Sequence, residues 1–464
     1  MTIDIGIKAV EIYFPNTCID QKDLEESDNC LGKYTVGLGQ IKMGVCSDLE
    51  DINSIALTVT KQLLENNFID PNDIGFLSVG TETLIDKSKS TKTVLMELFE
   101  KHGNTDIQGV DEKNACFGGT ASLFAALDWL ESSNCDGRLA IVVAADIAIY
   151  AEKAARCTGG AGAVAMLLGP NAPLIFDKGI RSHHMSHQWD FYKPKLDSEY
   201  PVYDGQLSII SYQKSIDKCF QLYKKKCLNK GLINQSMILF RENYYFCFHS
   251  PYTKLVEKSF ARLVFNDIKD NPDIVEQFNE QLEDIKPFLH LNIENTYGNR
   301  DFDLSFLKFS DTLIKDKLRP GVLMAQNNGN MYTASLYGSL ISVLIQTPIE
   351  ELVGSRIVLF SYGSGLASCM FSLMITENKM KLSEIKDSLN KIVDNLKNRI
   401  ILSYKEFEDF LARRSSINCK CNVKPSTELS YLKSGTFYLS EIDEKYRRKY
   451  QIYNSEITNG YSHY

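Results

Sequence analysis

Hydrophobic positions along this chain form short continuous runs that alternate with stretches of helical periodicity. The continuous runs are rich in valine, isoleucine and alanine, which is typical of strands buried on both faces. Strands that alternate with amphipathic helices predict a layered α/β fold. The predicted strands are Ile5–Phe14, Gly75–Thr83, Leu139–Tyr150, Gly162–Leu168, Asn243–His249, Gly321–Gln326, Ile357–Tyr362 and Leu366–Ile375, and the predicted helices are Asp51–Asn66 and Ser88–Lys101.

Two segments of the first half reappear in the second half in the same order. The helix-forming run Thr120-Ala-Ser-Leu-Phe-Ala-Ala-Leu is matched by Thr333-Ala-Ser-Leu-Tyr-Gly-Ser-Leu, and a strand at Gly162 is matched at Gly365. The two matches predict a duplicated α/β unit, and chance similarity between helices rich in small residues is the alternative. The duplication aligns Cys116 with Gly329, so we expect both helix N-termini at one cleft.

Two charged segments are expected at the periphery of this core. Asp270–Lys286 and Lys379–Leu411 carry helical patterns with little glycine, which favours surface helices over linkers. The polar tail from Asn454 onward is expected to be loose.

Composition and charge narrow the function classes. With 464 residues, 44% of them hydrophobic, the chain is long enough for a large core. A formal net charge of −8 argues against nucleic-acid binding through a basic surface, and the longest apolar run is interrupted by Asp146 and too short to span a membrane. Twelve cysteines without disulfide or zinc spacing, and an opening stretch without a signal or transit pattern, predict a soluble, cytoplasmic protein.

A cysteine just before two glycines is the strongest candidate for chemistry. Cys116 stands in Asn114-Ala-Cys-Phe-Gly-Gly-Thr, immediately before a helix-forming run. At a helix N-terminus a thiol meets the positive end of the dipole, which is expected to lower its pKa and to give a nucleophilic thiolate. The alternative is a small, buried, unreactive side chain.

Two further residues lie at the ends of predicted strands. Glu82 is a candidate base if it is desolvated, and a helix cap is the alternative. His249 is placed for proton transfer, and a core histidine with satisfied hydrogen bonds is the alternative. Lys254 and Lys258 follow it at helical spacing, which suits a phosphate-bearing substrate, whereas Arg262 on the same face is expected in solvent.

Two loops and a histidine group complete the candidates. The glycine-containing loops 327–331 and 361–365 can offer backbone N–H groups to an oxyanion or can be ordinary turns. His183, His184 and His187 lack the carboxylate–histidine spacing of zinc hydrolases, so no metal is predicted.

These residues lie in long blocks that together resemble one family. The blocks are Lys33–Gly44, Gly80–Ser90, Asn114–Thr120, Thr158–Ala165, Asp190–Pro194, Phe248–Ala261, Asn328–Leu340 and Phe360–Ala367, and the similarity continues to Arg448. In order and content they closely resemble the hydroxymethylglutaryl-CoA synthases of the eukaryotic type, which belong to the thiolase-like condensing enzymes. The resemblance covers nearly the whole chain.

The resemblance implies a fold, an activity and partners. The fold would be a thiolase-like five-layered αβαβα arrangement of two similar halves, residues 1–172 and 173–464, in a homodimer. The activity would be condensation of acetyl-CoA with acetoacetyl-CoA and water to 3-hydroxy-3-methylglutaryl-CoA, in the mevalonate route to sterols and isoprenoids. CoA thioesters are then substrates, and no cofactor, metal, nucleic acid or membrane is implied.

The resemblance also implies residue roles. Cys116 would carry the acetyl group, Glu82 would remove a proton from its methyl group, and His249 would hold and polarise the acceptor. An acyl pocket would be lined by Thr158, Ser208, Asn330 and Ser364. The CoA phosphates would be bound by Lys254 and Lys258. The site would be supported by His184 and Asp190.

Three positions depart from the family pattern. Phe117 replaces the tyrosine that usually follows the nucleophile, Ala154 removes an amide that helps to hold substrate, and Cys157 replaces a proline. These departures keep two alternatives open: a catalytically weakened, CoA-binding paralogue, and another thiolase-like condensing enzyme such as a ketoacyl synthase or thiolase. Because those other condensing enzymes lack the Glu82 block, Glu82 discriminates against the second alternative.

Overall fold

One curved sheet of ten strands organises the protein. The computed structural model describes residues 4–151, 153–233, 238–271 and 283–455. The strand order is β12-β13-β14-β8-β1-β7-β6-β4-β5, with β9 paired to β14. The strands are β1 (Ile5–Tyr13), β4 (Ile74–Gly80), β5 (Asp111–Glu112), β6 (Leu139–Ala148), β7 (Gly160–Pro170), β8 (Leu174–Phe176), β9 (Ser182–Met185), β12 (Tyr244–Phe248), β13 (Arg356–Gly363) and β14 (Ala367–Ile375).

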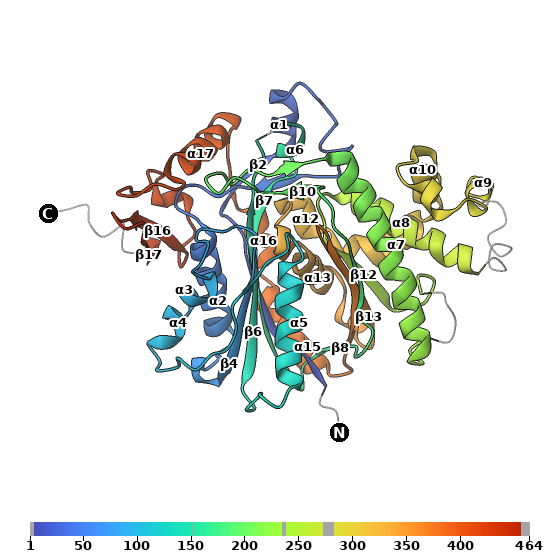
Figure 1. Cartoon of the computed structure of the whole chain (residues 1–464), viewed down its shortest axis with the longest axis horizontal. Coiled ribbons are helices and arrows are strands. Elements are labelled where there is room, and N and C mark those ends of the chain that lie inside the picture. The colour runs from blue at the N-terminus through green and yellow to red at the C-terminus, as the bar shows by residue number, and fades with distance from the viewer. Residues whose placement is uncertain (1–3, 152, 234–237, 272–282, 456–464) are drawn as a thin grey trace.

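The sheet and its helices form five layers, which are packed together by three hydrophobic cores (Figure 1). The central core joins both halves of the sheet to α5 (Gly118–Glu131) and α13 (Ser335–Gln346). One outer core packs α2 (Ile52–Asn66), α3 (Thr91–Leu95) and α4 (Glu97–Glu100) on the first half, and the other packs α7 (Gly205–Asn229), α8 (Thr253–Asp270) and α10 (Arg300–Phe309) on the second half. The predicted layered α/β fold with two similar halves is therefore confirmed.

Strand β6 shows why its sequence is continuously apolar. Its alternate residues Ala140, Val142 and Ala144 face the central core, while Ile141 and Val143 face the outer core. Because both faces of the strand are covered, the alternation of polar and apolar residues disappears. Asp146 is the charged exception, and it lies at the end of the strand nearest the site described below.

The two helices of the sequence repeat meet in the middle layer. Figure 1 shows α5 and α13 between the two halves of the sheet. Gly119 makes their close approach possible, because a Cβ there would lie 2.9 Å from Thr333 O and 2.9 Å from the Cβ of Ala144. Thr333 belongs to the short helical turn η6 (Tyr332–Ala334) that precedes α13, so both repeated helices begin at the same end of the layer.

One predicted strand is wrong. Gly321–Gln326 is helical, comprising the end of η5 (Arg319–Gly321) and most of α12 (Leu323–Asn328). A short apolar run does not distinguish a buried strand from a buried helix. Here Met324 packs in the central core, and its N–H is bonded to Ser342 Oγ at 3.1 Å rather than to a neighbouring strand.

The predicted peripheral segments are partly described. Lys379–Leu411 forms α15 (Lys379–Leu389), α16 (Ile392–Lys397), β15 (Ile400–Ile401) and the first part of α17 (Tyr404–Ile417), and α15 buries Leu382, Ile385 and Leu389 in the central core. Most of the predicted segment Asp270–Lys286, and the tail beyond residue 455, lie outside the described residues.

The remaining elements are short and connect or cover the layers. They are β2 (Thr17–Asp20), α1 (Gln21–Ser27), β3 (Lys42–Gly44), η1 (Pro71–Asp73), α6 (Lys153–Arg156), β10 (Phe191–Tyr192), β11 (Val202–Tyr203), α9 (Lys286–Leu289), η3 (Ile293–Thr296), α11 (Asp311–Leu313), η4 (Ile314–Leu318), α14 (Ile349–Leu352), η7 (Leu429–Tyr431), β16 (Phe437–Ile442) and β17 (Arg448–Ile452).

Candidate active site

Cys116 lies in a tight turn between β5 and α5. Ala115 before it adopts a left-handed backbone, with φ 44°, which is uncommon for a residue with a side chain. The N–H of Phe117 donates to Asn114 O at 3.0 Å and closes the turn. At the end of β13, Gly363 lets the next loop reach this turn, because a Cβ there would lie 2.4 Å from Asn114 O. The turn therefore fixes Cys116 at the contact between the two halves.

Glu82 follows β4 and faces the cysteine. The Cys116 Sγ lies 3.2 Å from Glu82 Oε1, within hydrogen-bonding distance for a thiol donor. The other carboxylate oxygen, Oε2, lies 3.2 Å from Nζ of Lys193. Lys193 also lies 4.5 Å above the ring of Tyr332, and Glu82 is only 8% exposed. Cys116 and Glu82 are thus brought together as predicted.

Asp146 fixes the backbone around Glu82. Its Oδ1 accepts hydrogen bonds from the N–H groups of Glu82 and Thr83, both at 2.9 Å, and from the hydroxyl groups of Thr81 and Thr83. Its Oδ2 accepts from the N–H of Thr333 at 3.0 Å and from its hydroxyl at 2.5 Å. One buried carboxylate therefore connects the Glu82 strand end to the N-terminus of the other repeated helix.

The expected lowering of the Cys116 pKa is wrong. Burial and the neighbouring Glu82 carboxylate raise the pKa of the thiol well above its ordinary value. The pKa of Glu82 is also raised, first by burial, although Lys193 opposes the shift. The helix dipole acts on the thiol pKa like a fraction of one elementary charge. The loss of hydration and the full negative charge of Glu82 together outweigh it. At neutral pH the cysteine is therefore a thiol that donates to Glu82.

His249 follows β12 directly and is buried. Its N–H donates to Phe360 O at 2.8 Å, and its carbonyl accepts from the hydroxyl of Tyr212 at 2.7 Å, so its backbone is fixed. Burial lowers the pKa of the imidazole to about 3, which keeps the ring neutral. Within the described protein its Nδ1 has no hydrogen-bond partner. A neutral ring with a free nitrogen is suited to a substrate carbonyl or hydroxyl.

A cavity of about 250 Å³ joins Cys116 and His249, and Glu82 reaches it through its contact with the Cys116 sulfur. Its lining is largely apolar and includes the aromatic residues Tyr150, Phe191, Tyr203, Tyr332 and Tyr362. The predicted site residues that line it are Cys116, Thr158, Ser208, His249, Asn330 and Ser364. The cavity therefore combines a thiol, a neutral imidazole and hydroxyl and amide groups in an apolar wall, as in sites that bind small acyl groups.

The polar groups of the wall are oriented by hydrogen bonds. Asn330 Oδ1 accepts from Tyr332 N and from Ser335 Oγ, both at 2.9 Å, so its amide nitrogen is the donor left for the cavity. Ser208 Oγ lies 3.1 Å from Asp190 O. The Asp190 carboxylate accepts from Gly365 N at 2.8 Å and from the Tyr362 hydroxyl at 2.7 Å. Asp190 is thus hydrogen-bonded to the loop and strand end that carry Tyr362 and Ser364 of the wall.

Comparison with known proteins identifies the family. The family model for the N-terminal part of hydroxymethylglutaryl-coenzyme A synthase matches residues 1–173, and the model for the C-terminal part matches residues 174–453. The chain belongs to the hydroxymethylglutaryl-CoA synthase family. The enzymes of this family are condensing acyltransferases, so the resemblance seen in the sequence and the enzyme class are confirmed.

Individual relatives agree over nearly the full length. The chain is 48% identical over 461 residues to hydroxymethylglutaryl-CoA synthase 2 of Blattella germanica, covering 97% of this chain and 98% of the relative. It is 48% identical to the cytoplasmic enzyme of Gallus gallus and 47% identical to the mitochondrial enzyme of Mus musculus, covering 96% of this chain and 87% and 89% of those relatives. The solved structure of MvaS in complex with 3-hydroxy-3-methylglutaryl coenzyme A has a TM-score of 0.82 at 29% identity, over 98% of this chain and all of that one.

The predicted phosphate-facing lysines lie outside the cavity wall, near the start of α8. Lys254 is ion-paired with Glu257 at 2.7 Å and Lys258 with Asp303 at 3.1 Å, and each lysine remains about one third exposed. A phosphate would have to compete with these carboxylates. Arg262, expected in solvent, is instead buried and ion-paired with Asp217 at 2.7 Å, because α7 covers this face of α8.

His184 does not line the cavity. It lies on β9, and its carbonyl accepts from Ser368 Oγ at 2.7 Å. Burial and the nearby Lys214 and Lys218 lower the pKa of its imidazole. Its strand β9 pairs with β14, which contributes no residue to the cavity lining.

The three departures from the family pattern fall in different surroundings. Ala154 lines the cavity, where an amide would reach a ligand. Phe117 is buried in the central core, and Cys157 is buried against α1, where its carbonyl accepts from Gln21 Nε2 at 2.7 Å. Only the Ala154 position bears directly on substrate contact.

Sequence reasoning missed Lys193, Asp146 and Tyr332 as site residues. In the sequence, Lys193 stands within the block that contains Asp190, and Asp146 is a single charge that interrupts an apolar run. A charge inside a buried strand was the available signal for Asp146, since such a charge needs partners. No local signal connects Lys193 to Glu82, because their contact depends on the tertiary fold.

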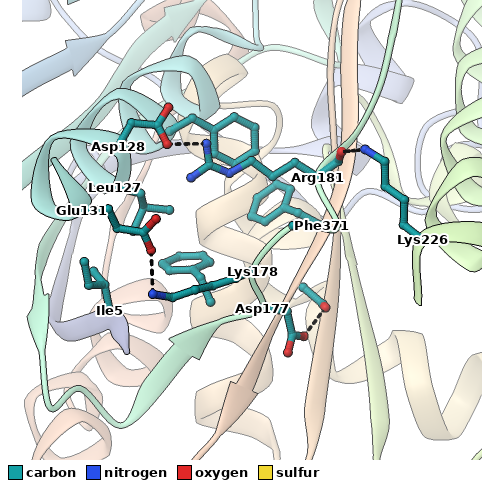
Figure 2. Close-up of a pocket in the computed structure, with 13 residues that line it drawn as sticks. Ile5, Leu127, Asp128, Glu131, Asp177, Lys178, Arg181, Lys226 and Phe371 are labelled. Atoms are coloured by element: carbon teal, nitrogen blue, oxygen red, sulfur yellow. Dashed lines mark hydrogen bonds and ion pairs between the residues drawn. The ribbon is translucent and has the colours of Figure 1, made fainter. Parts of the chain in front are cut away.

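A second cavity, of about 310 Å³, lies beside α5 and β8 (Figure 2). Its charged side chains pair with one another: Asp128 with Arg181 at 2.8 Å and Glu131 with Lys178 at 2.9 Å. Lys226 donates to Arg181 O. Because these charges compensate each other and the lining contains no thiol or histidine, this cavity is not a candidate for the condensation chemistry.

The described residues offer neither a metal site nor a membrane-spanning helix. They contain no group of three or more histidine, cysteine, aspartate or glutamate side chains arranged to hold a metal ion. None of their helices has the length and apolarity needed to cross a bilayer. All twelve cysteines are free thiols.

Proposed function

We propose that this chain condenses acetyl-CoA with acetoacetyl-CoA and water, giving 3-hydroxy-3-methylglutaryl-CoA and CoA through an acetyl-Cys116 intermediate. The observation that carries the proposal is the 3.2 Å contact between Cys116 Sγ and Glu82 Oε1 at an acyl-sized cavity. A nucleophile in contact with a base is the arrangement required for covalent catalysis followed by carbon deprotonation.

In the first step Cys116 attacks the acetyl carbonyl of acetyl-CoA. The sulfur–carbon bond to Cys116 forms, the bond to the CoA sulfur breaks, and the Cys116 proton passes to Glu82 and on to the leaving CoA. The raised pKa of the thiol supports this order, because the thiol needs an acceptor for its proton at the moment of attack. Backbone N–H groups near Cys116 and Ser364 would stabilise the oxyanion.

In the second step Glu82 removes a proton from the acetyl methyl group. The resulting enolate carbon forms a bond to the ketone carbon of acetoacetyl-CoA, and the ketone oxygen takes up a proton. Water then cleaves the thioester and regenerates the Cys116 thiol. A Glu82 carboxylate with a raised pKa is a stronger base than an exposed one, and its position next to the sulfur brings it near the methyl group.

His249 would hold and polarise the acceptor ketone as a neutral ring. The low pKa supports a neutral hydrogen-bond donor rather than an imidazolium. Thr158, Ser208, Asn330 and Ser364 are proposed to contact the acyl groups, because they line the same cavity.

Residues outside the wall would act on the rest of the substrate or on the wall itself. Lys254 and Lys258 are proposed to bind the CoA phosphates by exchanging their carboxylate partners for phosphate oxygens. His184 and Asp190 would support the site through the strand and loop that they contact.

Assembly, pathway and location form a second part of the proposal. The two halves would be residues 1–172 and 173–464, and two copies would form a homodimer; the short outermost strand β5 and the 59% exposed Val110 beside it offer a surface for pairing. We place the enzyme in the cytoplasm and in the mevalonate route to sterols. Relatives named cytoplasmic and mitochondrial are about equally similar, so cell fractionation tests the location.

The experiment is an assay of the purified protein with both CoA thioesters, together with intact mass measurement after exposure to acetyl-CoA alone. We expect loss of acetoacetyl-CoA, release of CoA and one acetyl group on Cys116. A Cys116→Ala variant should show neither. Absence of acetylation would overturn the proposal, and bound CoA without turnover would favour the weakened paralogue suggested by Phe117 and Ala154. Formation of a product other than the hydroxymethylglutaryl thioester would favour another condensing enzyme.

A further inference from the structure

The loop that carries Lys193 is held at its base by the active site. Residues 193–201 connect β10 to β11, whose pairing sets Phe191 opposite Tyr203, and both of these aromatic residues line the acyl cavity. Asp204 N donates to Asp190 O at 2.9 Å and closes the base. Lys193, the first residue of the loop, makes the ion pair with Glu82.

The tip of the same loop is held by the C-terminal end of α17, more than 200 residues later in the sequence. Arg414 binds the Glu199 carboxylate through two nitrogens, at 2.9 Å and 2.5 Å. Asn418 Nδ2 donates to Asp197 O at 3.0 Å, and Cys419 Sγ approaches Leu196 O at 3.6 Å. These contacts converge on the short stretch 196–199, so the loop tip is attached to α17 rather than to its own sheet.

Arg414 also attaches this assembly to the first half of the chain. Its Nη1 donates to Glu50 O at 2.6 Å, in the turn that precedes α2, and its side chain is only 7% exposed. A buried guanidinium is stable only when its donors are satisfied, and here a carboxylate on the loop and a carbonyl on the core satisfy them together. The guanidinium therefore fixes the loop tip relative to the turn that precedes α2.

We propose that Arg414 and Glu199 are positioning residues for the condensation step, because they hold loop 193–201 so that Lys193 stays against Glu82. The inference rests on the proposed role of Glu82 as the base. A lysine side chain has several rotatable bonds, so one anchored end of the loop does not by itself determine where its ammonium group lies. With both ends fixed, the ammonium is kept within 3.2 Å of the carboxylate.

The charge around Glu82 predicts the direction of the effect. Glu82 is faced by the cation of Lys193, by the anion of Asp146, and by the Cys116 thiol and the Tyr150 and Tyr332 hydroxyl groups. Lys193 lowers the pKa of Glu82, and burial and Asp146 raise it. When Lys193 moves away, the Glu82 pKa rises further, so more of the base is protonated at a given pH and the acid limb of the condensation profile moves to higher pH.

The test compares Glu199→Gln, Lys193→Gln and the double variant, with Arg413→Gln as the matched control. Arg413 is the exposed neighbour of Arg414, and its guanidinium bonds to Ser426 O. We expect Glu199→Gln to lower the condensation rate by about ten- to a hundred-fold, a range typical of a misplaced catalytic group, and to move the acid limb upward. Acetylation of Cys116, measured against the Arg413→Gln control, should fall less than condensation does.

The double variant separates positioning from general support of the fold. If Glu199 acts through Lys193, the Glu199→Gln substitution should lower the condensation rate little further in the Lys193→Gln variant. Both substitutions then remove the same interaction, the contact between Lys193 and Glu82. Fully multiplicative losses, or a slower rate without any movement of the acid limb, would overturn the positioning role. A Glu82→Gln variant that condenses normally would instead overturn the proposed function, so the two failures are distinguishable.

Discussion

The sulfur of Cys116 and the carboxylate of Glu82 form a hydrogen-bonded pair, with Sγ 3.2 Å from Oε1. The pair has two consequences that point in opposite directions. Glu82 disfavours the thiolate and raises the pKa of Cys116, yet it also provides the acceptor that a neutral thiol needs during attack. Once the sulfur is acetylated, the same carboxylate faces the acetyl group and becomes available for its methyl proton.

The first prediction separates these two uses of Glu82. In Glu82→Gln we expect acetylation of Cys116 to persist at a reduced rate, because the easier ionisation of the thiol without the negative charge offsets part of the loss of the proton acceptor. Condensation should fall by about a hundred- to ten-thousand-fold, the usual contribution of a positioned base. Intact mass after acetyl-CoA exposure and the loss of acetoacetyl-CoA give the two readouts. Equal decreases in the rates of acetylation and condensation would contradict the assignment of Glu82 as the base of the condensation step.

A second prediction concerns the ionisation of the thiol directly. The alkylation rate of Cys116 by iodoacetamide should rise with pH, with a midpoint above that of an ordinary thiol, because burial and Glu82 raise its pKa. In Glu82→Gln the midpoint should move to lower pH and alkylation at neutral pH should become faster, although turnover is lost. Peptide mass spectrometry resolves Cys116 from the exposed Cys419, and Cys116→Ser gives the background. Slower alkylation in Glu82→Gln would show that the carboxylate promotes the thiolate instead.

The sequence was sufficient to predict those parts of the site that depend on local motifs. Cys116 before a helix, Glu82 at a strand end and the repeated helices α5 and α13 were predicted from their own segments. The raised thiol pKa could not be, because it arises from burial and from a carboxylate 34 residues earlier. The helix dipole at Cys116 can be inferred from the local sequence. The desolvation that outweighs its effect on the thiol pKa arises only when the layers pack together.

The contacts of Lys193 and the helical state of Gly321–Gln326 were missed for a similar reason. The loop that carries Lys193 is held in position by contacts between α17 and residues 196–199. The pattern of hydrophobic residues does not predict these contacts. The Gly321–Gln326 run is apolar enough for a strand, and its helical state depends on packing against Ser342 of α13. Short apolar segments take the structure that their tertiary neighbours satisfy.

A third prediction concerns Asp146 and stability. In Asp146→Asn one side of the carboxylate becomes an amide N–H₂ group that cannot accept. Either the N–H groups of Glu82 and Thr83, or the N–H and hydroxyl of Thr333, then lose their acceptor. We expect a loss of about 2–4 kcal/mol in the free energy of unfolding, the range for a disrupted buried network. Asp128→Asn, which removes only an exposed ion pair to Arg181, is the control and should change stability by less than about 1 kcal/mol.

The same variant gives a fourth prediction, in the pH profile. The Asp146 anion raises the pKa of Glu82, so its neutralisation lowers that pKa. Because Glu82 is active as a carboxylate, the acid limb of condensation should move to lower pH in Asp146→Asn, in the opposite direction to Lys193→Gln. Rate profiles of both variants check the signs. A shift in the same direction for both would mean that the limb reports a group other than Glu82.

The last prediction concerns substrate contact at α6. Ala154 lines the acyl cavity at a position where the family pattern has an amide side chain. The Ala154→Asn substitution should therefore restore a hydrogen bond to bound substrate. One neutral hydrogen bond is worth about 1 kcal/mol, which corresponds to an approximately five-fold lower KM with kcat little changed. Phe117→Tyr is the comparison, because Phe117 is buried in the central core and a hydroxyl there meets packed side chains. An unchanged KM in Ala154→Asn would show that substrate passes this helix without contact.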